Sequence, residues 1–139
     1  MRPLSTLWKK PTIAHVSIGV RDIDRSKRFY DTVLEPLGYK CLRAARTLLG
    51  YGYGRDNIAL WIVQAEHPVP TDEKSGLHFC FAAENAAAVD AFHAAALRSG
   101  GQDNGAPGLR PIYGPDYYAA FIIDPDGYRI EAYYGPGET

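Results

Sequence analysis

The chain has 139 residues and a formal net charge of −1, with 46% hydrophobic and 22% charged side chains. This length fits one domain, residues 1–139, and the composition is that of an ordinary globular core. The chain lacks the basic excess that neutralises a phosphate backbone, and its apolar runs fall far short of the roughly 18 residues of a membrane span. Nucleic acid and membrane partners are therefore not expected.

Two further features bear on the cellular compartment. Residues 1–11 lack the apolar segment of a signal peptide. The two cysteines, Cys41 and Cys80, form no CxxC pair and are too few for a disulfide framework. We therefore expect a cytoplasmic protein, and a role as a small packed hydrophobic residue is favoured for Cys80.

The first half of the chain has the pattern of a strand, a helix and three more strands. Residues 12–20 alternate apolar side chains with polar or small ones, which predicts a strand. Asp22 or Asp24 can cap a helix that the apolar spacing predicts over 26–34, and Gly38 follows its end. Three short strands, separated by turn-prone residues, are predicted near 39–43, 48–53 and 58–63.

The second half repeats this order after a polar, proline-containing linker at about 64–76. Residues 77–83 predict a strand, Asn85 can cap the next helix, and Gly100 with Gly101 ends that helix. Three more strands are predicted near 110–113, 117–123 and 127–134.

The two halves also match residue by residue. Alignment of His15 with His78, an offset of 63 residues, aligns Asp22 with Asn85, Phe29 with Phe92, Leu34 with Leu97 and Gly38 with Gly101. This repeat predicts an α+β fold of two tandem βαβββ units, at about 12–63 and 77–134. Each unit covers one face of its sheet with a helix, so two curved mixed sheets are expected to enclose a cleft.

Three polar side chains are expected to face that cleft. Because side chains alternate on strands, His15, His78 and Glu131 point away from the helix side. Two imidazoles and one carboxylate in a facial arrangement suit a divalent metal ion such as Fe, Mn, Ni or Zn. The sequence therefore predicts a metal site formed by these three residues.

Three segments resemble the vicinal oxygen chelate superfamily, which includes glyoxalase I, extradiol dioxygenases, fosfomycin-modifying thiol transferases and bleomycin-binding resistance proteins. They are Ile13-Ala14-His15-Val16, Gly76-Leu77-His78-Phe79 and Asp124-Pro125-Asp126-Gly127-Tyr128-Arg129-Ile130-Glu131. The resemblance spans about residues 13–134. Residues 104–121 are similar to a branch whose members mostly lack an assigned reaction.

The resemblance implies a metal-dependent lyase, isomerase or extradiol-type dioxygenase acting on a small substrate with neighbouring oxygens. Glyoxalase I has a fourth ligand in its first unit, at the position that the repeat assigns to Trp61 here. Indole has only a donor group and cannot serve as that ligand. The remaining set, His15, His78 and Glu131, resembles that of extradiol dioxygenases. A homodimer is also implied, because two chains commonly associate in this superfamily.

Other members of the superfamily bind a small molecule in the same cleft without metal, and Trp61 keeps that alternative open. Its indole can stack on a flat ligand or simply fill space. Tyr133 shares the inward face with Glu131 and is a candidate general acid, with Glu131 itself as a catalytic base. Arg110, on a predicted rim loop, and Tyr118 are further candidates for substrate binding.

Overall fold

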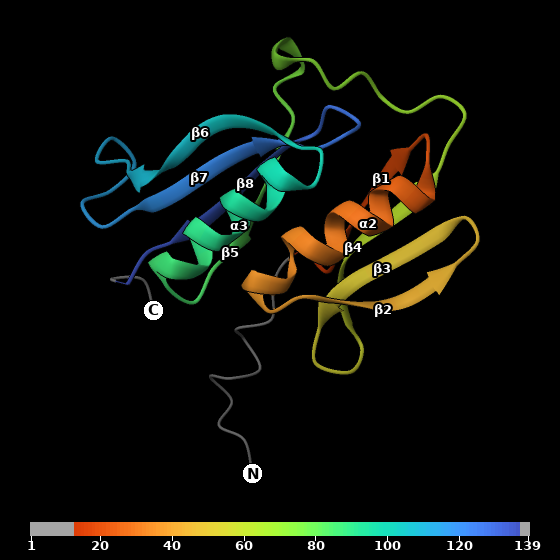
Figure 1. The fold of residues 1–139 in the computed structure, drawn as a ribbon, viewed down its shortest axis with the longest axis horizontal. Coiled ribbons are helices and arrows are strands. Elements are labelled where there is room, and N and C mark those ends of the chain that lie inside the picture. Colours follow the sequence, from red (N-terminus) through yellow and green to blue (C-terminus); the bar gives the residue numbers. More distant parts are fainter. Residues whose placement is uncertain (1–12, 137–139) are drawn as a thin grey trace.

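The computed structural model describes residues 13–136, in which two four-stranded sheets each carry one long helix (Figure 1). The first sheet contains β1 (Val16–Val20), β2 (Lys40–Ala45), β3 (Leu48–Tyr53) and β4 (Asn57–Gln64) in the order β1-β4-β3-β2. The second contains β5 (His78–Ala82), β6 (Gln102–Leu109), β7 (Tyr118–Ile123) and β8 (Arg129–Tyr134) in the order β5-β8-β7-β6. The expected α+β fold of two βαβββ units is confirmed. Residues 1–11 and the predicted strand start at Thr12 lie outside the described residues.

Both helices begin at the residue types that favour a helix start. The side chain of Asp22 accepts a hydrogen bond from the Arg25 amide at the start of α2 (Ile23–Val33). Asn85 accepts one from the Ala88 amide at the start of α3 (Ala86–Arg98). These bonds satisfy amides that have no partner within the helix. Asp22 is therefore the cap, and α2 begins three residues before the predicted range.

The two helices lie side by side on the same side of the molecule and contact each other (Figure 1). Their buried stripes pack on the sheets and include Phe29, Tyr30 and Val33 of α2 and Val89, Phe92 and Ala96 of α3. In residues 13–136, no helix is long and apolar enough to cross a bilayer.

The predicted strand at 110–113 is wrong, because the strand that follows α3 is β6, at Gln102–Leu109. Gly105, Pro107 and Gly108 gave this segment the composition of a loop. It nevertheless pairs with β7, with register shifts between Asp103 and Gly105 and between Gly105 and Gly108. Proline is tolerated because β6 is an edge strand with one hydrogen-bonding partner.

The strand register reproduces the sequence repeat. Val16 pairs with Leu60 where β1 runs parallel to β4, and Phe79 pairs with Ile130 where β5 runs parallel to β8. One residue further, Trp61 faces Ser17 and Glu131 faces Cys80. Trp61 and Glu131, which are 70 residues apart, therefore occupy the same position of the two units, as the sequence repeat predicts.

A buried hydrogen bond ties the two units together. The hydroxyl of Tyr30, on α2, donates to Oδ2 of Asp124 at 2.5 Å, and both residues are at most 4% exposed. The other oxygen of Asp124 accepts from the amides of Asp126 and Tyr128. Asp126 also binds the guanidinium of Arg25 at 3.0 Å. The turn before β8 is thus held against the helix of the first unit.

This carboxylate makes stability depend on pH. Burial raises the pKa of Asp124 from 3.8 to about 6, although the hydrogen bond from Tyr30 opposes the shift. Between about pH 4 and pH 6 the folded state therefore binds more protons than the unfolded state. The contribution of Asp124 to stability is complete below this window and is lost as pH rises through it.

We expect Asp124→Asn to remove this dependence, because the amide keeps an oxygen acceptor but cannot ionise. As the pH rises from about 4 to about 7, the unfolding free energy of the variant should increase relative to that of wild type by on the order of 2 to 3 kcal/mol. Urea denaturation at a series of pH values measures this difference. Parallel pH profiles for the two proteins would contradict the expectation.

Candidate functional site

The second sheet has one face under α3 and one face without a helix, which we call the open face. Ile130 and Ala132 of β8 are buried on the helix side. Between them, Glu131 lies opposite Cys80 of β5 and Phe121 of β7, so all three share the open face. His78, two residues before Cys80, shares it by the same alternation.

Glu131 is the buried polar group of this face, with 3% of the residue exposed. Its Oε1 lies 3.1 Å from Nε2 of His78, and its Oε2 accepts a hydrogen bond from the Tyr117 hydroxyl at 2.5 Å. The side chain of His78 is 53% exposed, so the imidazole connects the buried carboxylate to solvent. Two contacts thus connect His78 of β5, Glu131 of β8 and Tyr117, which directly precedes β7.

Tyr117 is a site residue that the sequence analysis missed. It directly precedes β7, and its ring stacks on that of Tyr133, with centroids 4.2 Å apart. Burial, followed by the hydrogen bond to Glu131, raises the pKa of the Tyr117 phenol, so the group is a neutral donor. Tyr117, Ala119 and Phe121 alternate on one face, a pattern that could have selected Tyr117 from the sequence.

Cys80 is exposed, not packed as expected, and it lies beside the carboxylate. Its thiol lies on the strand position opposite Glu131. Partial desolvation of the sulfur and the neighbouring carboxylate raise the pKa of Cys80 to about 12, so the thiol stays protonated at neutral pH. Cys80 is therefore a poor nucleophile in this arrangement.

Of the three predicted ligands, the structure brings together two. His15 is exposed, one residue before β1. Within residues 13–136, no three His, Cys, Asp or Glu side chains form a group that could hold a metal ion. In this described part of the chain, His15 is therefore not grouped with His78 and Glu131 as the sequence predicts.

The other predicted residues divide between the two faces. Tyr133 lies on the open face, where it stacks on Tyr117. The guanidinium of Arg110 lies 5.5 Å from the centroid of the Phe121 ring, and its Nη2 donates to the Ala106 carbonyl at 2.6 Å. Tyr118 faces the other way, because its hydroxyl binds Asp90 of α3 at 2.5 Å. Alternation thus places Tyr118 away from Glu131.

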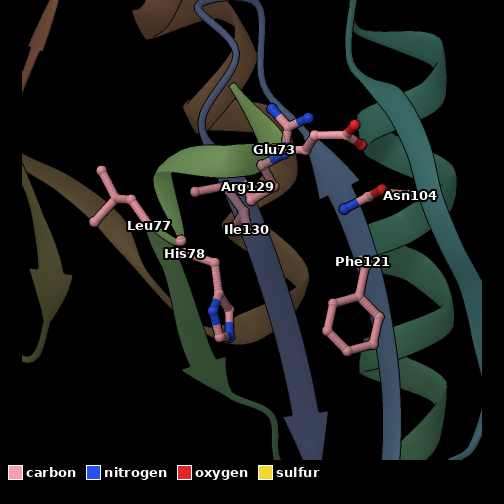
Figure 2. A pocket seen from close by; sticks show the side chains of 8 residues that line it. Glu73, Leu77, His78, Asn104, Phe121, Arg129 and Ile130 are labelled. Carbon is pink, nitrogen blue, oxygen red and sulfur yellow. The ribbon is translucent and has the colours of Figure 1, made fainter. Parts of the chain in front are cut away.

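A cavity of about 280 Å³ adjoins His78. Figure 2 shows His78 and Phe121 pointing the same way, with Asn104, Glu73 and Arg129 toward one end. A larger groove of about 820 Å³ is lined by β5, by the start of β4 and by further residues of the first unit, among them Val16 and Tyr39. The carboxylate site is therefore next to space for a small molecule.

The profile of the Glyoxalase/Bleomycin resistance protein/Dioxygenase superfamily matches residues 12–132, and the chain belongs to this superfamily. The uncharacterized protein YqjT of Bacillus subtilis is 32% identical over 130 residues, which cover 84% of this chain and 94% of that protein.

Solved structures agree with this family. A glyoxalase/bleomycin resistance protein from Albidiferax ferrireducens is 32% identical, with a TM-score of 0.76 over 89% of this chain and 99% of that chain. The fosfomycin resistance protein FosX of Mesorhizobium loti is 19% identical, with a TM-score of 0.65 over 92% and 95% of the two chains, and shares the fold.

In the first unit, Trp61 lies over a glycine. A Cβ atom on Gly50 would be 2.7 Å from Cζ3 of Trp61 and 3.0 Å from Cδ1 of Ile58. Gly50 pairs with Trp61 across β3 and β4, so the missing side chain makes room for the indole.

We expect Gly50→Ala to lower the unfolding free energy by about 1 to 3 kcal/mol, because the indole must move or the strand must shift. Gly114→Ala is the control, since its Cβ would lie 3.7 Å from Cβ of Tyr117, an ordinary contact. Chemical denaturation of both variants measures the difference. Equal stability of the two would show that the indole is not confined by Gly50.

Proposed function

We propose that this protein is a metal-dependent enzyme that acts, as a cytoplasmic homodimer, on a small substrate with two neighbouring oxygen atoms. The reaction class is that of a lyase or isomerase, or of an extradiol-type dioxygenase. The observation that carries the proposal is the pair of His78 and Glu131, whose Nε2 and Oε1 lie 3.1 Å apart on the open face.

This separation fits two ligands of one ion. Ligand atoms that each lie about 2.1 Å from a divalent metal at a right angle are about 3.0 Å apart. Imidazole and carboxylate are also the donor types of the two-histidine, one-carboxylate sites of Fe, Mn, Ni and Zn. When bound, such an ion would polarise both substrate oxygens and stabilise the negative charge that develops on them.

The surrounding residues supply binding and proton transfer. Glu131 is the candidate base for a substrate C–H proton, and Tyr133, on the same face, is the candidate donor. Arg110, beside Phe121, is the candidate partner for a carboxylate or phosphate of the substrate. The cavity beside His78, at about 280 Å³, has the size for a small molecule.

The third ligand in this proposal is His15 of the partner subunit. One chain holds two ligands in contact, while its own His15 is exposed and outside the group. A dimer that places the face of the first sheet not covered by α2 against the open face of the partner's second sheet would combine the three residues. Each site would then contain residues of both chains.

A second candidate function, metal-free binding of a flat small molecule, is favoured by Trp61. This residue occupies the position of Glu131 in the first unit, and its large ring is not a metal ligand. Both oxygens of Glu131 also have hydrogen-bonding partners without a metal ion. The ligand would then stack on the indole in the first unit.

Metal content separates the two functions. We expect about one equivalent of divalent metal per chain in protein expressed without a histidine tag, and its loss in His78→Ala and in Glu131→Ala, since each removes one ligand. His67→Ala, at an exposed linker position, is the control and should keep its metal. Mass spectrometry of purified proteins measures the content. Metal-free wild type after supply of Fe, Mn, Ni and Zn salts would favour the binding function.

The two-chain site predicts complementation. We expect a mixed dimer of one His15→Ala chain and one His78→Ala chain to hold about half of the wild-type metal, because one of its two sites keeps all three ligands. Two different tags without histidine allow isolation of the mixed dimer from co-expressed chains. A site built within one chain would be damaged in both subunits, and the mixed dimer would then hold no metal.

A further inference from the structure

The two oxygens of Glu131 have different partners, and this difference assigns a role to Tyr117. We propose that Tyr117 is a positioning residue. Its hydroxyl occupies Oε2 of Glu131, so that only Oε1 is available to a metal ion bound beside His78. The inference rests on the proposed metal site and adds to it a residue outside the ligand set. The hydroxyl of Tyr117 donates to Oε2 of Glu131 at 2.5 Å, while Nε2 of His78 lies 3.1 Å from Oε1.

The backbone holds Tyr117 in place. Residues 110–117 form the connection between β6 and β7, which is closed by a hydrogen bond of 2.7 Å from the Arg110 amide to the Tyr117 carbonyl. Within it, the Tyr113 amide donates to the Arg110 carbonyl and the Gly114 amide to that of Pro111. The phenol of Tyr117 therefore projects from a defined turn rather than from an open loop.

The ring is held as firmly as the backbone. It stacks on Tyr133 at 4.2 Å with an interplanar angle of 27°, and the ring of Tyr113 lies 5.3 Å away. A stacked ring has little freedom to rotate its hydroxyl away from the carboxylate. Because Glu131 is 3% exposed, little water is available to replace this donor, so the hydrogen bond leaves Oε1, on the side of His78, as the oxygen for a metal ion.

The number of open metal positions depends on this choice. If the site holds an octahedral ion, two histidines and a carboxylate bound through one oxygen would occupy three of its positions and would leave three for substrate and a co-reactant or water. A carboxylate bound through both oxygens would occupy a fourth position. Tyr117 would thus preserve room for a substrate that binds the ion through two neighbouring oxygens and for one further small ligand.

Cobalt(II) titration of the dimeric protein tests the proposal, because the visible absorption of the ion reports its coordination as well as its affinity. We expect Tyr117→Phe to weaken cobalt(II) binding by about 10-fold to 100-fold, the usual effect of removing a hydrogen bond to a metal ligand. We also expect its absorption spectrum to change. The phenylalanine keeps the ring that stacks on Tyr133, so the fold is retained.

Tyr118→Phe is the matched control, since it removes a hydroxyl from the neighbouring residue but on the helix side, where that group binds Asp90. It should bind cobalt(II) with wild-type affinity and spectrum. If Tyr117→Phe behaves like this control, Tyr117 does not position the carboxylate, whereas the metal site stands. If wild type itself binds no cobalt(II), the metal site is refuted and the role of Tyr117 with it.

Discussion

The position of strand β8 between the strands β5 and β7 is the constraint on which the site depends. β8 pairs in parallel with β5 and antiparallel with β7, so the register on both sides is defined. A shift of one residue would turn Glu131 toward α3 and expose Ile130, which is 1% exposed here. The apolar packing of Ile130 and Ala132 under the helix therefore holds the carboxylate on the opposite face.

The same strand is tied to the first unit through the turn that precedes it. Asp124 and Asp126 flank this turn, and both are bound by side chains of α2. Tyr128, at the end of the turn, donates from its hydroxyl to the Gly19 carbonyl at 2.6 Å. The duplicated units are thus joined by polar contacts with defined partners as well as by apolar packing, which gives the second sheet a fixed orientation relative to α2.

Strand alternation and the sequence offset were sufficient to predict the two units, the helix cap at Asn85, and the shared face of His78 and Glu131. β6 was missed because its glycines and proline have loop propensity and only pairing with β7 makes it a strand. The separation of His15 from the other two residues could not be predicted, because alternation describes one sheet and says nothing of how two sheets are arranged. Alternation places Tyr117 on the face of Phe121, but its hydrogen bond to Glu131 also depends on the turn that carries it, which alternation does not predict.

The irregularity of β6 has a consequence for self-association. An exposed sheet edge can pair with the edge of another molecule and so start aggregation. Pro107 has no amide hydrogen to donate, and the register shifts around Gly105 interrupt the row of outward-facing amides and carbonyls. An incoming strand cannot form a continuous ladder along β6. This outer edge of the second sheet is therefore protected from uncontrolled strand addition, whereas the inner edge at β5 has no such interruption.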